Sequence, residues 1–181
     1  MGHVGRRRCW VGWATVAVAA LGVSCATPHR RTAPTRPRPV APVPAPIENV
    51  DSDDDVQALV DAHNVERSQR RLEPLRFNPA LGEAATLHAQ DMARRGKMSH
   101  TGGDRSSPFD RMTRAGYRFT RAGENVAAGQ TSVAEVMRDW MHSPGHRRNI
   151  LGAFREIGVA RVTGADGTSY WCATFGRADG A

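Results

Sequence analysis

Apolar positions recur at helical spacing in the part of the chain that begins at Asp53. Acidic residues suit a helix N-terminus, and the run 53–55 precedes such a stripe. A second stripe follows Asn78 and Pro79, which are suited to an N-cap and to the first helical position. The pattern predicts one helix over 53–71 and another from Pro79 to Gly96.

Two further helices are expected downstream. The segment 108–115 fits a short helix that begins at a proline. Thr131 or Ser132 can cap a longer helix, which keeps Trp140 on its inner face until Pro144-Gly145 breaks it.

The period changes to two after Glu156. Two β-rich runs, 156–162 and 170–175, flank a glycine-containing turn at 164–167, and together they predict a hairpin. Helices followed by paired strands indicate an α+β fold with helices packed on an antiparallel sheet. We assign this domain to residues 53–181.

The N-terminus has a different pattern. Arg6-Arg7-Arg8 precedes an apolar run over 11–23, the order of a secretory signal, and the run is short for a membrane span. Residues 1–25 are therefore predicted to direct export. The run ends at Cys25 in a sequence that resembles a lipoprotein lipobox, although Gly22 stands where leucine is preferred. Lipidation of Cys25 and ordinary cleavage after Cys25 or Ala26 both remain open.

Proline dominates the segment that follows. Seven of the eleven prolines lie within 27–46, and proline favours extended polyproline II. Residues 26–52 are predicted to form a tether that holds the domain away from a surface, while a plain disordered linker fits the composition equally.

Charge separates these two parts of the chain. The first 46 residues contain seven arginines and no acid, whereas all eighteen acids and the other eighteen basic residues lie from Glu48 onward. The domain is thus formally neutral, with scattered arginines, and we expect no nucleic-acid partner. Cys172 is the single cysteine of the domain, so we expect no internal disulfide and a buried thiol.

Five segments together carry a resemblance to a known family. In order along the chain they are 63–67, Ser99-His100, the Gly-Glu-Asn-Val run 123–126, 140–151 and 170–176. This set closely resembles the CAP superfamily of cysteine-rich secretory, antigen 5 and pathogenesis-related proteins, and in particular its bacterial SCP-like branch. The resemblance covers about 56–176 and implies a three-layer α-β-α sandwich around an antiparallel sheet.

The resemblance also implies a cleft in which histidines and acids converge. The matching residues are His100, Glu124 and His146, which could hold Zn²⁺ or another divalent cation as three protein ligands. The family's second acid is expected at Ser143, so this chain lacks the full set. Asn125 is expected to tie loop backbone.

Structural roles compete with these assignments. Asn149 is expected, like its counterpart in the 123–126 segment, to bond backbone, and Trp140 to fill the core. His100 could simply bond its own loop, and Glu124 could pair with Arg121. Arg67 is expected to form a buried pair with an acid, and the proline at 144 should leave His142 exposed.

Two classes of function remain. The first is a binding or structural module at the cell envelope, whose ligand is a peptide, glycan or lipid group. The second is a hydrolase in which a metal or a His/Glu pair activates water. Binding is favoured over catalysis because the sequence has neither a Gly-x-Ser-x-Gly elbow nor a His-Glu-x-x-His motif.

Overall fold

The computed structural model describes residues 53–180, and Cys25, the leader and the tether lie outside them. The described chain forms five helices and four strands. In chain order these are α1 (Asp53–Ser68), β1 (Arg76–Phe77), α2 (Pro79–Arg95), α3 (Pro108–Arg114), β2 (Phe119–Ala128), α4 (Val133–His142), α5 (Pro144–Ile150), β3 (Glu156–Thr163) and β4 (Ser169–Ala178).

The strands form one sheet in the order β1-β3-β4-β2. β4 pairs antiparallel with both β3 and β2, which confirms the expected antiparallel centre. The two-residue strand β1 runs parallel to β3, so the complete sheet is mixed. β2 forms one edge of the sheet.

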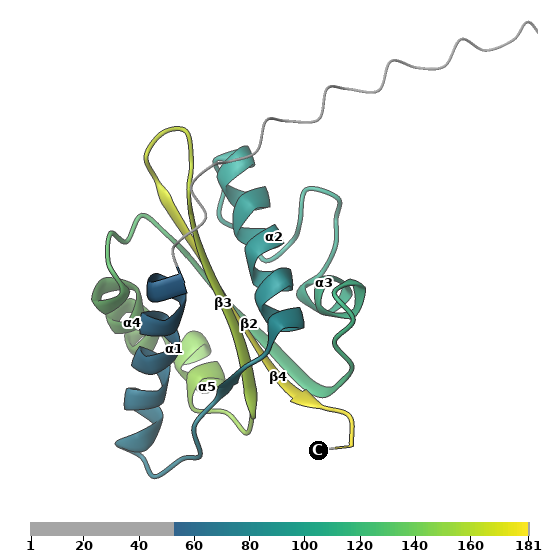
Figure 1. Cartoon of the computed structure of the whole chain (residues 1–181). Coiled ribbons are helices and arrows are strands. Elements are labelled where there is room, and N and C mark those ends of the chain that lie inside the picture. Colours follow the sequence, from purple (N-terminus) through teal and green to yellow (C-terminus); the bar gives the residue numbers. More distant parts are fainter. Residues whose placement is uncertain (1–52, 181) are drawn as a thin grey trace, which may run out of the picture. The chain divides into compact units, whose positions relative to one another are not determined.

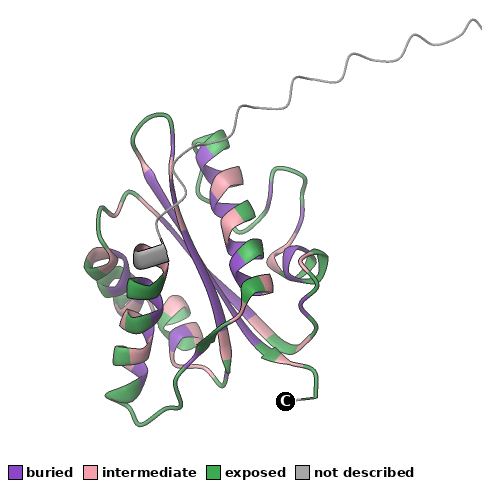
Figure 2. Cartoon of the chain, viewed as in Figure 1, coloured by how far each residue is buried: buried purple, intermediate pink, exposed green. Residues whose placement is uncertain are grey.

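Helices cover both faces of this sheet, as Figure 1 shows: α1, α4 and α5 lie on one side and α2 and α3 on the other. The predicted α-β-α sandwich is therefore confirmed. Alternate residues of β4 point to opposite faces, with Trp171 and Phe175 toward α1 and α4 and Cys172 toward α2. Figure 2 shows the resulting buried stripe along the strands and the inner helix faces.

Helix α2 lies unusually close to the sheet. A Cβ placed on Gly158 would come within 2.0 Å of the Leu81 carbonyl carbon, so only glycine fits there. Beside it, the Thr174 hydroxyl donates a hydrogen bond to the Leu81 carbonyl at 3.0 Å. This contact fixes α2 over the two central strands of the sheet, β3 and β4.

The helix ends follow the expected capping chemistry. Asn78 accepts hydrogen bonds from the amides of Ala80 and Leu81, and Gly96 ends α2 with a left-handed φ of 58°. Pro144 ends α4 as predicted, but it also starts a new helix, α5, because proline is tolerated at the first helical position.

Arg67 has a different partner from the one expected. Its buried guanidinium donates to the backbone carbonyls of Glu73, Ile150, Gly152 and Phe154. It binds no acid among the described residues; instead it joins the end of α1 to the segment after α5. Within 53–180 no helix is both long and apolar enough to cross a membrane.

Candidate functional site

The edge strand β2 positions the residues of the Gly-Glu-Asn-Val segment. Successive side chains of a strand face opposite sides of a sheet, so Glu124 points to the side of α2 and α3 and Asn125 to the side of α5. The pairing of Glu124 with Thr174, which contacts α2, agrees with this arrangement. The segment therefore contributes side chains to both helical layers of the sandwich.

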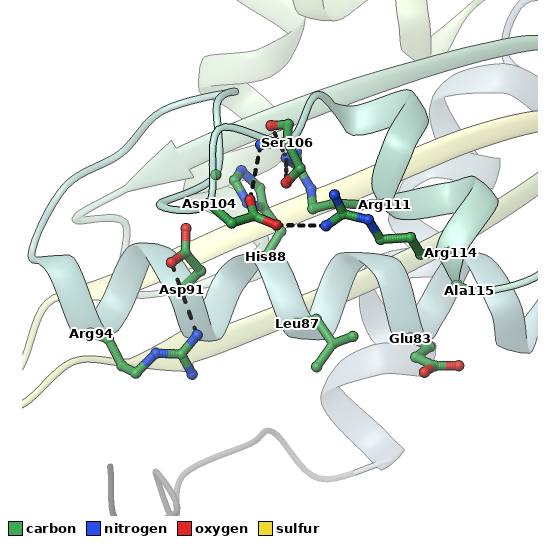
Figure 3. A pocket seen from close by; sticks show the side chains of 11 residues that line it. Glu83, Leu87, His88, Asp91, Arg94, Asp104, Ser106, Arg111, Arg114 and Ala115 are labelled. Atoms are coloured by element: carbon green, nitrogen blue, oxygen red, sulfur yellow. Dashed lines mark hydrogen bonds and ion pairs between the residues drawn. The ribbon is translucent and has the colours of Figure 1, made fainter. Parts of the chain in front are cut away.

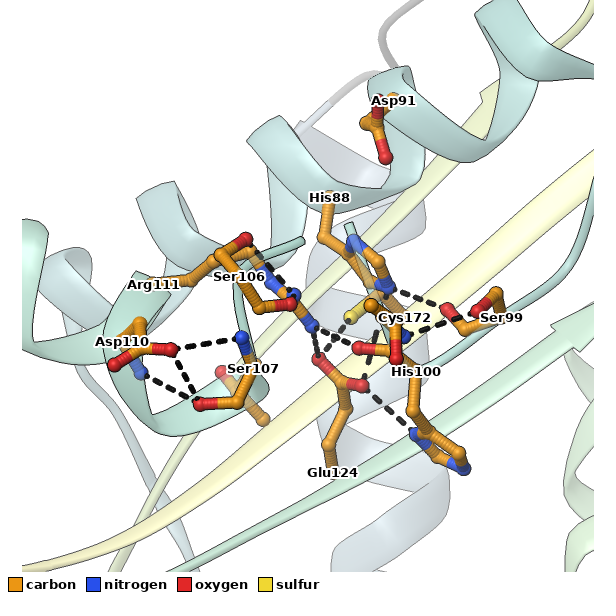
Figure 4. A network of polar contacts seen from close by, with 12 residues as sticks. His88, Asp91, Ser99, His100, Ser106, Ser107, Asp110, Arg111, Glu124 and Cys172 are labelled. Carbon is orange, nitrogen blue, oxygen red and sulfur yellow. Dashed lines mark hydrogen bonds and ion pairs between the residues drawn. The ribbon is translucent and has the colours of Figure 1, made fainter. Parts of the chain in front are cut away.

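The Glu124 carboxylate is buried and fully engaged, as Figure 4 shows. Arg111 Nη2 donates to Oε2 at 2.7 Å, and His100 Nδ1 donates to Oε1 at 2.9 Å. Arg111 also donates to the His100 carbonyl at 3.0 Å. Glu124 thus pairs with Arg111 rather than with Arg121, and the three residues form one hydrogen-bonded unit.

His100 is the open member of this unit. Its side chain is 55 % exposed, while that of Glu124 is 1 % exposed. The hydrogen bond to Glu124 raises the pKa of His100, because the carboxylate stabilises the imidazolium. None of the hydrogen bonds among residues 53–180 involves His100 Nε2, and the ring lies at the outer end of the cluster in Figure 4.

His146 comes from α5, on the opposite side of the sheet. Asn125 Nδ2 donates to the His146 carbonyl at 3.1 Å, and Asn149 Nδ2 donates to the Glu124 carbonyl at 3.1 Å and to Asn125 Oδ1 at 2.8 Å. The two asparagines thereby hold α5 against β2. Burial lowers the pKa of His146, and the nearby charge of His100 lowers it further.

The remaining candidates lie around the α4–α5 junction. Trp140 is buried, and the centroid of its ring lies 6.4 Å from that of His146. Ser143 caps the end of α4 and the start of α5, and its side chain makes no capping hydrogen bond to α5. His142 is exposed, with Nδ1 bonded to the Arg138 carbonyl at 2.7 Å.

The expected metal ligands His100, Glu124 and His146 are not arranged as a three-ligand site. Within 53–180 no three His, Cys, Asp or Glu side chains are grouped so as to hold a metal ion. Both carboxylate oxygens of Glu124 are occupied, and the charge of Arg111 opposes a cation there. Glu124 therefore orients the His100 ring from behind and does not itself face a ligand. The three-ligand arrangement is not formed in this geometry.

Sequence reasoning missed two members of the cluster. Arg111 lies on the short helix α3, and no motif marked it. His88 lies on the inner stripe of α2, where its Nε2 donates to the Ser99 carbonyl at 2.7 Å and lies 3.9 Å from Glu124 Oε1. The sequence signal that could have identified His88 was its position as a histidine on an otherwise apolar helix stripe.

A pocket of about 320 Å³ lies on the outer side of this cluster, between α2 and α3. Figure 3 shows His88 and Arg111 at its wall and the Arg114–Asp104 ion pair beside them. Its wall carries acidic and basic side chains in equal number, so it is not specific for ligands of one charge.

Cys172 lies beneath Glu124 and is unsuited to nucleophilic attack. Its side chain is fully buried, and Sγ lies 3.7 Å from Glu124 Oε2. Burial and the neighbouring carboxylate both raise the pKa of the thiol. The residue is therefore a protonated part of the core, as its apolar strand suggested.

The comparisons with known proteins agree with the fold and the motifs. Residues 60–175 match the sequence model of the cysteine-rich secretory protein family, CAP. The chain therefore belongs to the CAP family, as the five segments indicated. Protein YkwD of Bacillus subtilis is 38 % identical over 118 residues, which are 65 % of this chain and 45 % of that protein. A second relative, the membrane protein YlbC of the same organism, is 29 % identical over 56 % of this chain and 30 % of its own.

Solved structures place the chain beside bacterial SCP domains. An extracellular protein containing a SCP domain from Bacillus anthracis is 29 % identical, with a TM-score of 0.62, and 68 % of this chain covers 40 % of that one. An outer surface protein of Borrelia burgdorferi shares the fold, with a TM-score of 0.67 at 21 % identity over 72 % of this chain and 98 % of its own. The chain spans less than half the length of the curated relatives it matches.

Proposed function

We propose that this chain is an exported CAP-domain protein that acts as a binding or structural module at the cell envelope. The pattern of its first 25 residues, a basic start followed by an apolar run, supports export. The B. anthracis relative is described as extracellular and the Borrelia neighbour as an outer surface protein, which agrees with this location.

One observation carries the choice of binding over catalysis. The Glu124 carboxylate is buried and bonded to both Arg111 and His100, while the His100 ring stands open to solvent. A carboxylate that is neutralised by a guanidinium is a poor general base and a good positioning group. The arrangement therefore presents a fixed imidazole to a ligand, with His146 as the second contact.

The ligand class follows from what these two imidazoles can do. They can bond a polar group of a peptide, glycan or lipid, or they can hold a divalent cation as ligands. A bound cation would supply Lewis acidity toward an oxygen of the ligand. The role of Glu124 in either case is to fix the ring orientation and tautomer of His100.

A hydrolase is the second candidate, and the His100–Glu124 hydrogen bond favours it. An imidazole oriented by a carboxylate is the arrangement of a general base that activates a nucleophile. The raised pKa of His100 opposes this role near neutral pH, since it increases the protonated fraction. The buried thiol of Cys172 supplies no nucleophile.

Thermal unfolding of the full chain with and without Zn²⁺ tests the binding site. We expect Zn²⁺ to raise the melting temperature and the His100→Ala, His146→Ala double variant to lose that rise. The matched control is His142→Ala, which removes an exposed histidine from the same α4–α5 region and should keep the rise. An equal rise in the double variant would place the metal elsewhere and contradict the two-histidine site.

A further inference from the structure

Two buried nitrogen atoms without protein partners belong to the wall of one pocket. Within residues 53–180, four buried side-chain nitrogen or oxygen atoms make no hydrogen bond. Two of the four are His88 Nδ1 and Arg111 Nε, and both residues line the pocket of about 320 Å³ between α2 and α3 that Figure 3 shows. We call it the α2–α3 pocket. Because buried polar groups are normally hydrogen-bonded, these two atoms indicate a place where a bound molecule completes the bonding.

The two nitrogens have complementary hydrogen-bonding roles. Nε2 of His88 donates to the Ser99 carbonyl at 2.7 Å, so this nitrogen carries the ring proton. Burial lowers the pKa of His88, and the neutral ring leaves Nδ1 as an acceptor. In Figure 4 the unbonded nitrogen lies on the side of the ring toward Asp91, which also lines the pocket. Arg111 Nε carries a hydrogen and is a donor.

Polar side chains form most of the remaining wall. The lining acids are Glu83, Asp91 and Asp104, and the lining arginines are Arg94, Arg111 and Arg114. Three carboxylates and three guanidinium groups leave the wall without net formal charge. Leu87 and Ala115 are the apolar side chains among the lining residues. Such a wall disfavours an apolar chain, and it favours a neutral ligand with several groups that donate and accept hydrogen bonds.

The hydroxyl groups of a sugar have these properties. One hydroxyl provides a donor and two acceptor lone pairs, so neighbouring hydroxyls on a ring can satisfy both His88 Nδ1 and Arg111 Nε. The pocket is much larger than the roughly 30 Å³ that one water occupies in the liquid. It is also at the lower end of the range for ligand sites, roughly 300–1,000 Å³. One compact sugar unit therefore suits it better than an extended peptide.

We propose that the α2–α3 pocket binds a neutral sugar unit of a glycan, with His88 and Arg111 as the buried partners of its hydroxyls. This site gives a chemical class to the envelope ligand and to that extent rests on the proposed function. It uses neither the His100 nor the His146 imidazole, so each site can fail without the other.

Titration of sugars into the full chain, followed by NMR, tests the proposal. The probes are glucose, mannose, galactose and N-acetylglucosamine, and the control compound is tetrahydropyran, a similar ring without hydroxyls. At least one sugar should cause saturable shifts at His88 and at the amides of the loop 102–106, and tetrahydropyran should cause none. Absence of a saturable shift with all four sugars, or equal shifts with tetrahydropyran, would overturn the proposal. Tighter binding of triglycine than of every sugar in this pocket would make the proposed ligand class wrong.

Two substitutions of His88 separate binding from packing. His88→Gln can keep a side-chain N–H near the Nε2 position for the Ser99 carbonyl, but it removes the Nδ1 acceptor. We expect a melting temperature close to that of the native chain and roughly tenfold weaker sugar binding, the upper end for one hydrogen bond. His88→Asn keeps an amide near the Nδ1 position and loses the bond to Ser99, so it should lower the melting temperature more and the affinity less. An unchanged affinity in His88→Gln would contradict the site.

Glu83→Ala tests the pocket without disturbing the core. Glu83 is exposed on α2, where alanine is a good helix former, so the melting temperature should not fall. The sugar affinity should fall at least about threefold, because one lining acceptor is lost. The matched control is Glu73→Ala, which removes an exposed acid that lines a different depression. Equal affinities in the two variants would reject the pocket as the binding site.

The double variant His100→Ala, His146→Ala distinguishes this proposal from the proposed function. Sugar binding should persist in it, since neither imidazole lines the α2–α3 pocket. Loss of sugar binding in the double variant, with native affinity in His88→Gln, would place the sugar at the imidazoles. That result would contradict the pocket and leave the proposed function intact.

Discussion

His63 is a fully buried histidine with a defined tautomer. Its Nδ1 donates to the Leu59 carbonyl at 2.7 Å, and its ring lies between Trp140 and Phe175, with centroid distances of 5.7 and 5.6 Å. Burial lowers its pKa to about 4. The ring is therefore neutral in the folded protein at pH values where it is protonated in the unfolded chain.

This pKa shift makes stability depend on pH. Below about pH 6.5 the unfolded chain binds a proton that the folded state refuses until about pH 4, so stability falls as pH decreases through this window. The shift corresponds to about 3 kcal/mol of unfolding free energy. Unfolding free energies measured by urea denaturation at several pH values should change less with pH for His63→Phe than for the control His142→Phe. Equal slopes would show that His63 does not cause the dependence.

The Glu124–His100 hydrogen bond predicts a second titration effect. Glu124→Gln removes the negative charge that stabilises the imidazolium, so the pKa of His100 should fall. NMR titration of the metal-free full chain measures it, with the His142 resonance as internal control. An unchanged pKa of His100 would mean that the hydrogen bond is absent in solution.

At the residue scale, the sequence identifies a site residue only where a local motif marks it. His100, Glu124 and His146 were identifiable because each sits in a recurring motif. Arg111 was not, because its relation to Glu124 arises only when α3 packs beside β2, 13 residues along the chain. The resulting hydrogen bonds changed the expected role of Glu124 from ligand to positioning residue.

At the scale of elements, caps and periodicity predicted α2 well because Asn78 and Gly96 mark its ends chemically. Strand β2 was not predicted. Its Arg121 is exposed, whereas the neighbouring Gly123 and Asn125 are buried, and they are buried by packing against other elements such as α5 rather than by an alternating pattern. Tertiary packing determined this strand, as it determined the short parallel strand β1.

The contact between α2 and β3 gives a prediction for an element interface. Gly158→Ala must push α2 away from the sheet, because the new methyl group would overlap the Leu81 backbone. We expect a loss of about 3 kcal/mol in unfolding free energy, at the upper end of overpacking costs. Gly145→Ala is the matched control: it meets one atom at 4.0 Å within α5 and should be neutral or stabilising. Similar effects of both substitutions in urea unfolding would reject the close contact.

At the scale of the whole molecule, the charge composition of the domain differs from the arrangement of its charges on the folded surface. The domain is close to neutral in composition, as counted from the sequence, and this suggested scattered arginines. The sheet nevertheless places Arg121 directly opposite Arg177, although the two residues lie far apart along the chain. Composition cannot reveal such a cluster, because it depends on strand register.

The N-terminal segment gives a prediction about location. If Cys25 carries a lipid, Cys25→Ala should move the full chain from the membrane fraction to the soluble exported fraction. Ser24→Ala is the neighbouring control and should leave fractionation unchanged. Membrane association that persists in Cys25→Ala would contradict lipid anchoring, and the question of export would then rest on the leader itself.

The central claim is that the His100–Glu124–Arg111 unit presents an imidazole for binding and does not drive turnover. The most direct measurement is hydrolysis of a peptide and ester library by the full chain with Zn²⁺, beside the His100→Ala, His146→Ala double variant and the control His142→Ala. The account predicts that the double variant hydrolyses the library as slowly as the native chain does, because neither histidine drives turnover. Turnover present in the native chain and in His142→Ala, but absent from the double variant, would contradict it and establish the hydrolase.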